Sequence, residues 1–185
     1  MMTPEHIQTL RKLMEFEAAR TEPPKGFPAL PDIPAGRYVD PRFHQLEQDH
    51  VWRKSWLLAA HIDEIPEPGC FMLWENAGQP VVIVHAESGV VNAFFNTCSH
   101  RGAPVVTAAS GKKKRFACPY HGWVWNGEGK NTHIPYQENC VNKTLKSWHV
   151  QEQHNCIFLW HDPTDSPPRW DLPHMFDDFT EFSDM

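Results

Sequence analysis

Two cysteine–histidine pairs stand seventeen residues apart in this chain. The first pair is Cys98 and His100 and the second is Cys118 and His121, so the pattern reads C-x-H-x17-C-x2-H. A glycine-containing turn follows each pair directly. Thiolates and neutral imidazoles are ligands that iron and zinc both accept. The spacing therefore predicts two short loops that fold together over one metal centre, each supplying one sulfur and one nitrogen.

This alternation of ligand types matches a Rieske [2Fe–2S] cluster, in which one iron takes both cysteines and the other takes both histidines. Neutral imidazoles on the second iron reduce the negative charge of the cluster and raise its potential above that of an all-cysteine cluster. We therefore expect Cys98, His100, Cys118 and His121 to hold the cluster. Glycines beside the ligands would let backbone N–H groups approach the sulfides.

A structural zinc site with two cysteines and two histidines is the main alternative for these four residues. Its usual order is C-x2–4-C followed by H-x3–5-H. Here the order alternates and the first gap is a single residue. Unligated cysteines and histidines in a core are a further alternative. The spacing favours the iron–sulfur cluster over both.

The segments Cys98-Ser-His-Arg-Gly-Ala and Cys118-Pro-Tyr-His-Gly-Trp resemble the two cluster loops of Rieske non-haem iron oxygenases, the α subunits of aromatic-ring-hydroxylating oxygenases and their relatives. The resemblance extends from about Tyr38 to about Pro168. It includes four further segments: Trp56-Leu-Leu-Ala-Ala-His, Pro80-Val-Val-Ile-Val, Phe94-Phe95-Asn96 and Ile157-Phe-Leu-Trp-His-Asp.

The resemblance implies an electron-transfer role in the catabolism of aromatic or steroid-like compounds. The chain would be the N-terminal Rieske half of an α subunit, passing electrons from a reductase or ferredoxin to a mononuclear Fe(II). It also implies a neighbouring α subunit as partner, in an assembly such as a trimer, because in the family the histidine edge of the cluster faces that subunit. Five residues beside the ligands would support the cluster: Arg101, Gly102, Tyr120, Gly122 and Trp123.

Three of the positions in the loops bear on the reduction potential. Respiratory-chain Rieske proteins add a cysteine to each loop and bridge them, whereas Ala103 and Tyr120 stand at those positions here. Trp123 replaces a serine that donates a hydrogen bond to sulfur. Fewer hydrogen bonds to sulfur imply a lower potential. Trp123 would either pack over the second loop or simply pack in the core, and we favour the core. Arg101 would tune charge or dock a partner.

An oxygenase of this family also needs a second iron in a 2-His-1-carboxylate site. The family carries that site in a C-terminal domain, with a D-x2-H-x4-H pattern and a later aspartate. His149 and His154 have the second spacing, but Lys146 stands three residues before His149. We interpret both histidines as structural and assign no catalytic residue to this chain. The mononuclear iron would belong to a missing or separate domain, which leaves open whether this chain alone is an enzyme.

Composition bears on the number of domains and on whether the protein binds nucleic acid, forms disulfides or spans a membrane. The chain has 185 residues with 41% hydrophobic and 12% aromatic content, enough for one domain with a core and appendages. A net charge of −6 argues against general nucleic-acid binding. Cys70, Cys140 and Cys156 show no pairing pattern, so we expect a reducing cytoplasm without disulfides. No apolar run approaches the ~20 residues of a membrane helix, and residues 1–16 lack the apolar region of a secretory signal.

The order of elements predicts three segments. Residues 1–55 would form a helix capped at Thr3, a proline-rich arm from Glu22 to Gly36 and a second helix capped at Asp40. Residues 56–161 would form the Rieske domain. Residues 162–185 would form an acidic, proline-containing tail that leads into a catalytic domain.

The fold class expected for residues 56–161 is mainly β, a small antiparallel sandwich or barrel with two cluster-binding loops. Lys112–Arg115 would be a basic turn, either solvated or able to dock an acidic electron donor. Short alternating or apolar runs separated by glycine, proline and asparagine predict the strands. These are Trp56–Ile62, Phe71–Glu75, Val81–Ala86, Val90–Phe95, Trp123–Trp125, Leu145–Glu152 and Cys156–His161.

Two other function classes remain open at this point. One is a standalone Rieske ferredoxin that carries electrons to another protein, although such proteins are usually shorter and lack an extension like residues 1–55. The other is a non-enzymatic interaction module stabilised by zinc or without metal.

Overall fold

The computed structural model describes residues 3–28, 31–140 and 142–173. The helices are α1 Pro4–Ala18, α2 Gly36–Val39 and α3 Pro41–His50, with 3-10 turns η1 Trp52–Lys54 and η2 Ile62–Glu64. The strands are β1 Leu57–His61, β2 Cys70–Trp74, β3 Val81–His85, β4 Val91–Phe95, β5 Ser110–Lys112, β6 Arg115–Ala117, β7 Val124–Asn126, β8 Asn131–His133, β9 Ser147–Gln153 and β10 Cys156–Trp160.

Both predicted helix starts are confirmed. The hydroxyl of Thr3 accepts a hydrogen bond from the His6 N–H at 3.3 Å, and Pro4 takes the first helical position of α1. The carboxylate of Asp40 accepts from the Arg42 N–H at 2.9 Å at the start of α3. Proline fits the first turn because its missing N–H would have no partner there. Within the described ranges, no helix combines the length and the apolar character of a membrane span.

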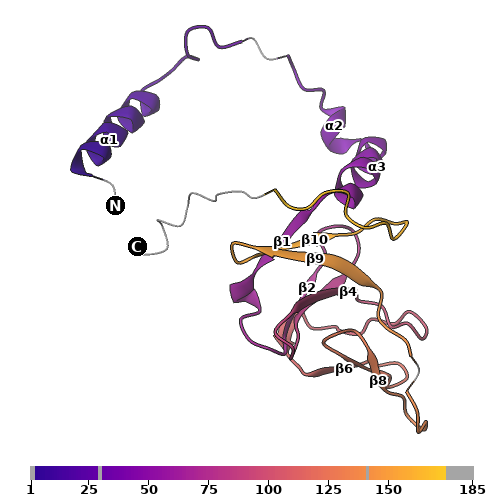
Figure 1. Cartoon of the computed structure of the whole chain (residues 1–185). Helices are drawn as coiled ribbons and strands as arrows, with labels where there is room; N and C mark the ends of the chain where they lie inside the picture. Colours follow the sequence, from indigo (N-terminus) through magenta and orange to yellow (C-terminus); the bar gives the residue numbers. More distant parts are fainter. Residues whose placement is uncertain (1–2, 29–30, 141, 174–185) are drawn as a thin grey trace. The chain divides into compact units, whose positions relative to one another are not determined.

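The chain divides into two units, one of residues 39–172 and the other of residues 1–38 with 173–185. The unit of residues 39–172 contains all the described strands, in two antiparallel sheets. The larger sheet has seven strands in the order β1-β10-β9-β4-β3-β2-β5, and the smaller has three in the order β6-β7-β8 (Figure 1). This arrangement confirms the expected mainly β, antiparallel fold. The larger sheet is curled into a half-barrel.

Strand β3 is an inner strand of the larger sheet and is buried on both faces. Its first four residues are all buried, and successive side chains point to opposite faces. Val82 and Val84 pack with the two predicted cluster loops, in a core that includes Trp125. Val81 and Ile83 pack on the other face, against β1, β9 and β10. The continuous apolar run of β3 therefore reflects two cores rather than one.

Three short strands escaped the sequence analysis, namely β5, β6 and β8. Each has only three residues, too few to show a period of two. Lys112 and Arg115 lie in β5 and β6, so the basic turn is confined to Lys113 and Lys114. Strand β9 also begins at Ser147 rather than Leu145.

The basic segment Lys112–Arg115, which includes the turn, is partly neutralised by neighbouring carboxylates. Lys112 pairs with Glu67, which raises the pKa of that lysine and lowers the pKa of the glutamate. Lys114 pairs with Glu87 at 3.0 Å. These ion pairs reduce the positive charge that this segment would offer an acidic partner.

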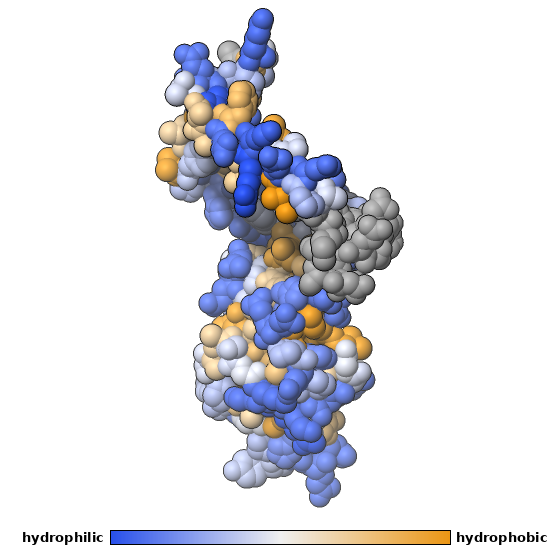
Figure 2. All heavy atoms as spheres, turned by 90° about the vertical axis from the view of Figure 1, so that its left-hand side faces the viewer, coloured by the Kyte–Doolittle hydropathy of each residue, from blue (hydrophilic) through white to orange (hydrophobic). Residues whose placement is uncertain are grey.

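On the face drawn in Figure 2, hydrophilic residues dominate and apolar residues form small groups among them.

The beginning of the predicted tail lies against the larger sheet's unit. The indole N–H of Trp56 donates to the Trp170 carbonyl at 2.8 Å, and Leu172 is buried. The Leu172 N–H donates to the side chain of Gln151 at 3.2 Å. The later part of the tail, from His174 onwards, lies outside the described residues.

Candidate metal centre

The two predicted loops have the same pattern of backbone hydrogen bonds, each within its own loop. In the first, between β4 and β5, the Cys98 N–H donates to the Ala103 carbonyl at 2.8 Å, and the Gly102 N–H donates to the Cys98 carbonyl at 2.9 Å. The second loop, between β6 and β7, repeats both hydrogen bonds at 2.8 and 3.0 Å with Cys118 in place of Cys98. Each loop thus turns back on its own cysteine, which holds the intervening histidine beside that cysteine.

Both frames require glycine at the fourth residue after the cysteine. Gly102 has φ of +77° and Gly122 has φ of +70°, a region that L residues with a side chain rarely adopt. The space around the two glycines differs. A Cβ on Gly102 would meet nothing within 4 Å, whereas a Cβ on Gly122 would lie 2.8 Å from the Pro135 ring. The sequence predicted the turns, and the structure adds that only the second is closely packed.

The two thiols are buried and face each other. Cys98 and Cys118 are 2% and 3% exposed, and both belong to the core between the sheets. Burial raises the pKa of the Cys98 thiol, and the nearby Cys118 thiol raises it further. The His100 backbone N–H and the Trp125 indole act in the opposite direction, although the indole N–H makes no regular hydrogen bond. Binding of a cation would overcome this rise, because a metal ligates the thiolate. All five cysteines are free in the structure.

The two imidazoles also form a pair. The ring centroids of His100 and His121 are 4.6 Å apart at an interplanar angle of 70°. The Nδ1 atom of His100 is buried and has no hydrogen-bond partner. Burial lowers the pKa of His100, and positive charge at His121, Arg101 and Lys143 lowers it further. A neutral ring with a free inward nitrogen is the state in which histidine ligates a metal.

These pairs fit the ligand division of a [2Fe–2S] cluster, with two sulfurs for one iron and two nitrogens for the other. The buried, unpartnered Nδ1 of His100 fits an inward ligand atom. Among the residues that the structure describes, no three potential metal-binding side chains converge on a single point. When bound, such a cluster takes up and releases one electron at a time.

Aromatic rings support the two histidines differently. Trp123 stacks on His100 with centroids 4.6 Å apart and planes within 4° of parallel. This corrects the expectation that Trp123 packs over its own, second loop, while its burial in the core is confirmed. The ring centroids of Tyr120 and His121 are 3.9 Å apart, with their planes tilted by 40°, and Tyr120 is 61% exposed. Arg101 is exposed beside His100.

The sequence analysis missed two residues that shape the first loop. The buried side-chain oxygen of Asn96 accepts from the N–H groups of Val105 and Val106, both at 2.8 Å, and its amide donates to the Val106 carbonyl at 2.7 Å. Asn96 thereby closes the whole loop across its base. The hydroxyl of Ser99 donates to the Thr144 carbonyl at 2.7 Å. The available signal for the first residue was an asparagine directly after the apolar strand that ends at Phe95.

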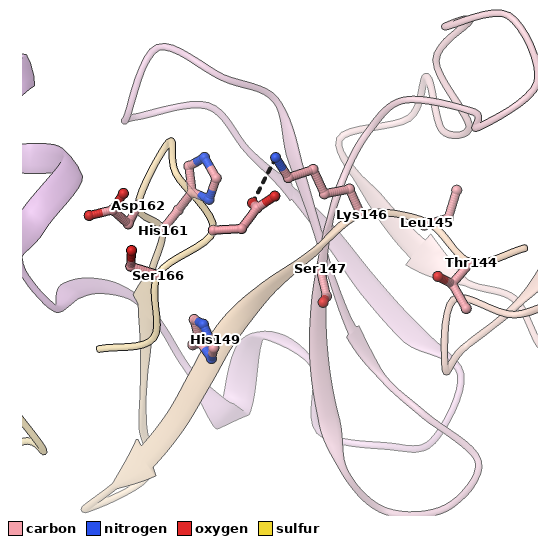
Figure 3. A pocket seen from close by; sticks show the side chains of 9 residues that line it. Thr144, Leu145, Lys146, Ser147, His149, His161, Asp162 and Ser166 are labelled. Carbon is pink, nitrogen blue, oxygen red and sulfur yellow. Dashed lines mark ion pairs between the residues drawn. The ribbon is translucent and has the colours of Figure 1, made fainter. Parts of the chain in front are cut away.

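A polar cavity of about 360 Å³ is lined in part by Thr144, whose carbonyl accepts the hydrogen bond from Ser99 of the first loop. Figure 3 shows His149 and His161 at this cavity, together with the ion pair between Lys146 and Asp165 at 2.8 Å. His154 lies instead in the turn between β9 and β10, with φ of +51°. The two histidines with x4 spacing therefore occupy a strand and a hairpin turn, as predicted. None of the four candidate cluster ligands lines the cavity.

Comparison with known families matches residues 55–150 to the Rieske [2Fe-2S] domain. The chain belongs to this Rieske family. Its cofactor is accordingly a Rieske [2Fe–2S] cluster, and the resemblance to ring-hydroxylating oxygenase α subunits is confirmed by the relatives that this part of the chain matches.

Three relatives illustrate the match. The benzene 1,2-dioxygenase α subunit of Pseudomonas putida is 37% identical over 123 residues, which cover 62% of this chain and 27% of the relative. The structure of naphthalene 1,2-dioxygenase from Rhodococcus sp. bound to indole has a TM-score of 0.66 at 25% identity, covering 91% of this chain and 38% of that one. A quaternary ammonium Rieske monooxygenase has a TM-score of 0.64 at 25% identity, covering 72% of this chain and 38% of that one.

The Rieske chain spans only about a quarter of the benzene dioxygenase α subunit and less than half of the two solved oxygenase chains. Of these relatives, the quaternary ammonium monooxygenase is associated with carnitine oxidation by gut microbiota and with inter-subunit electron transfer.

Alanine at the two loop glycines should separate backbone strain from crowding. We expect Gly102→Ala to lower the free energy of unfolding by about 1–2 kcal/mol, the usual cost of a left-handed alanine. Gly122→Ala should cost more, because its Cβ would also displace Pro135. Thermal unfolding of the cluster-loaded proteins measures both, with Gly78→Ala as a control of positive φ in open space away from the loops. Equal losses at Gly102 and Gly122 would contradict the difference in packing.

Proposed function

We propose that Cys98 and Cys118 bind one iron of the cluster, that His100 and His121 bind the other, and that this domain transfers electrons. The observation that carries the proposal is the pair of matched loops, which brings two buried thiols and two imidazoles together. The electron would enter and leave through the histidine side, because nitrogen-ligated iron is the one that is reduced in such clusters. Arg101, Gly102, Tyr120, Gly122 and Trp123 would support the ligands.

The electron acceptor in this proposal is a mononuclear non-haem iron of a ring-hydroxylating oxygenase. The similarity to the benzene and naphthalene dioxygenases supports that assignment and an aromatic substrate. The share of those relatives that the chain spans leaves the iron to a separate part or a neighbouring subunit. The inter-subunit transfer named for the quaternary ammonium monooxygenase supports a neighbouring α subunit as partner, in an assembly such as a trimer.

The electron donor in this proposal is a reductase or ferredoxin with an acidic surface. Arg101 and Lys143 both act on His100 electrostatically, and no carboxylate is among the groups that do so. Neither side chain forms an ion pair with a described residue. The chain as a whole carries a net charge of −6, so this positive edge stands out as a docking point by charge complementarity.

The division of the chain into an N-terminal extension of residues 1–55, a Rieske domain of residues 56–161 and a tail of residues 162–185 remains part of this proposal. The extension would help form subunit contacts, and the tail would lead toward the catalytic domain.

The ligand assignment predicts two irons and two acid-labile sulfides per chain in anaerobically purified protein. Replacing either histidine by cysteine, as His100→Cys or His121→Cys, should lose the Rieske electron paramagnetic resonance signal, because the nitrogen ligand is removed. His149→Cys is the matched control, since this histidine is exposed on β9, and it should keep the signal. A stoichiometric zinc content without sulfide would overturn the assignment.

The reduction potential should lie near the lower end of the Rieske range, at about −150 mV. Ala103 and Tyr120 provide no bridge between the loops, and Trp123 offers no hydroxyl to sulfur. Protein-film voltammetry measures the potential directly. A value above about +100 mV would show that other hydrogen bonds replace the missing ones.

Electron transfer itself can be tested with a reduced, acidic plant-type ferredoxin as donor. Its second-order rate of reducing the domain should fall with salt and should fall at least tenfold in Arg101→Glu, because the charge at the docking edge is reversed. Arg115→Glu carries the same charge change at the edge of the basic turn and should have a much smaller effect. The opposite ranking would move the docking point to the basic turn.

The same preparation should not hydroxylate aromatic or steroid substrates when it is supplied with a reductase and NADH. Oxygen activation needs an open iron with two histidines and a carboxylate. Product that disappears in His149→Ala or His154→Ala would place a catalytic iron on this chain. Electron transfer to a separate protein with no oxygenase partner would instead favour the ferredoxin-type alternative.

A further inference from the structure

We propose that Trp123 and Lys143 are positioning residues of the cluster: Trp123 fixes the plane of the His100 imidazole, and Lys143 places a positive charge that raises the reduction potential. This inference rests on the proposed ligand role of His100. It assigns a task to Lys143, which lies twenty-two residues after His121 and outside both loop motifs.

The contact between Trp123 and His100 is a parallel stack of the two rings. The two rings are 4.6 Å apart and within 4° of parallel, which leaves the imidazole little freedom to rotate. The indole is itself held in place, because it is only 9% exposed and lies 6.0 Å from Trp125. His121 lacks such a support, since its aromatic neighbour Tyr120 is 61% exposed. The geometry therefore restrains one histidine much more than the other.

Trp123 also connects the two loops. Its carbonyl accepts from the Cys118 N–H at 2.8 Å, so its backbone belongs to the frame of the second loop. Its ring supports the histidine of the first loop. A change in the position of one loop therefore reaches the other through this side chain.

Lys143 is held over this stack by its backbone. The Lys143 carbonyl accepts from the Asn131 N–H at 3.0 Å, and the next carbonyl, of Thr144, accepts from Ser99 at 2.7 Å. The Leu145 N–H donates to the Gly129 carbonyl at 2.8 Å. Residues 143–145 thus join the hairpin of the smaller sheet to the first loop. The Lys143 ammonium lies 5.7 Å from the centroid of the Trp123 ring, within reach of a cation–π attraction.

The charge of Lys143 is available to the cluster because no described carboxylate pairs with it. The Lys143 ammonium lies 5.7 Å from the Trp123 ring, and that ring stacks on His100, so this positive charge lies close to the proposed ligand. The same fixed positive charge favours addition of an electron to the iron that His100 would bind. Lys143 should therefore raise the potential.

Charge variants of Lys143 test this through the potential. Film voltammetry of the loaded protein should show a lower potential for Lys143→Met and a shift about twice as large for Lys143→Glu, because two charges are changed rather than one. Lys114→Met is the matched control, since Lys114 is paired with Glu87 and lies in the turn between β5 and β6. Unchanged potentials in both Lys143 variants would overturn the assignment.

Variants of Trp123 test the role in orientation. Trp123→Phe keeps an aromatic face and should retain g values close to those of the unmodified protein in electron paramagnetic resonance. Trp123→Leu should shift and broaden them, because the imidazole plane is no longer restrained. Identical spectra for Leu and Phe would overturn this role, and if the Leu variant fails to fold, a spectrum for Phe that differs from the unmodified protein would do so. Iron and sulfide contents are measured first, so an unmodified protein without a cluster would refute the ligand assignment instead.

Discussion

The burial of two facing thiols is the constraint on which this structure depends. Cys98 and Cys118 lie in the core between the two sheets, and burial raises the pKa of the Cys98 thiol. Two thiolates could not be buried side by side without a compensating cation, because an unpaired charge in an apolar environment is very costly. In the proposed assignment the cluster would supply that compensation, and its two cysteine ligands would at the same time be part of the core. Cluster binding and packing of the smaller sheet against the larger are therefore linked.

The two loops use one backbone frame for two different tasks. Both turn on a glycine four residues after the cysteine and close with the same pair of hydrogen bonds. The first loop is closed across its base by the buried Asn96 side chain and is joined to Thr144 by Ser99, whereas the second is packed directly against Pro135. The side chains then make the histidines unequal, with His100 stacked on a buried indole and His121 beside an exposed phenol. The two loops thus have the same backbone pattern, but the side chains around their two histidines differ.

The distribution of positive charge also distinguishes the surroundings of His100 from the rest of the chain. The chain is acidic overall, yet positive groups surround His100. The other basic cluster, at Lys112–Arg115, has two of its lysines engaged by Glu67 and Glu87. Counting basic residues along the chain would have favoured that turn, whereas the ion pairs favour the histidine edge as the electropositive surface. An acidic electron donor and a fixed charge near the cluster would both make use of this edge.

The sequence by itself indicated the family, and it supplied the candidate ligands and their division over two loops, because these depend on residue identity and spacing that no folding can change. It also predicted the capped helices at Thr3 and Asp40 and most strands of the larger sheet, since caps and apolar runs are local signals. The tertiary structure alone decided which ring supports which histidine. Trp123 belongs to the second loop in sequence but stacks on the first-loop histidine, and Lys143 reaches the same stack from a segment twenty or more residues away. Such contacts arise from the packing of one sheet on another, and sequence periodicity carries no information about partners across that interface.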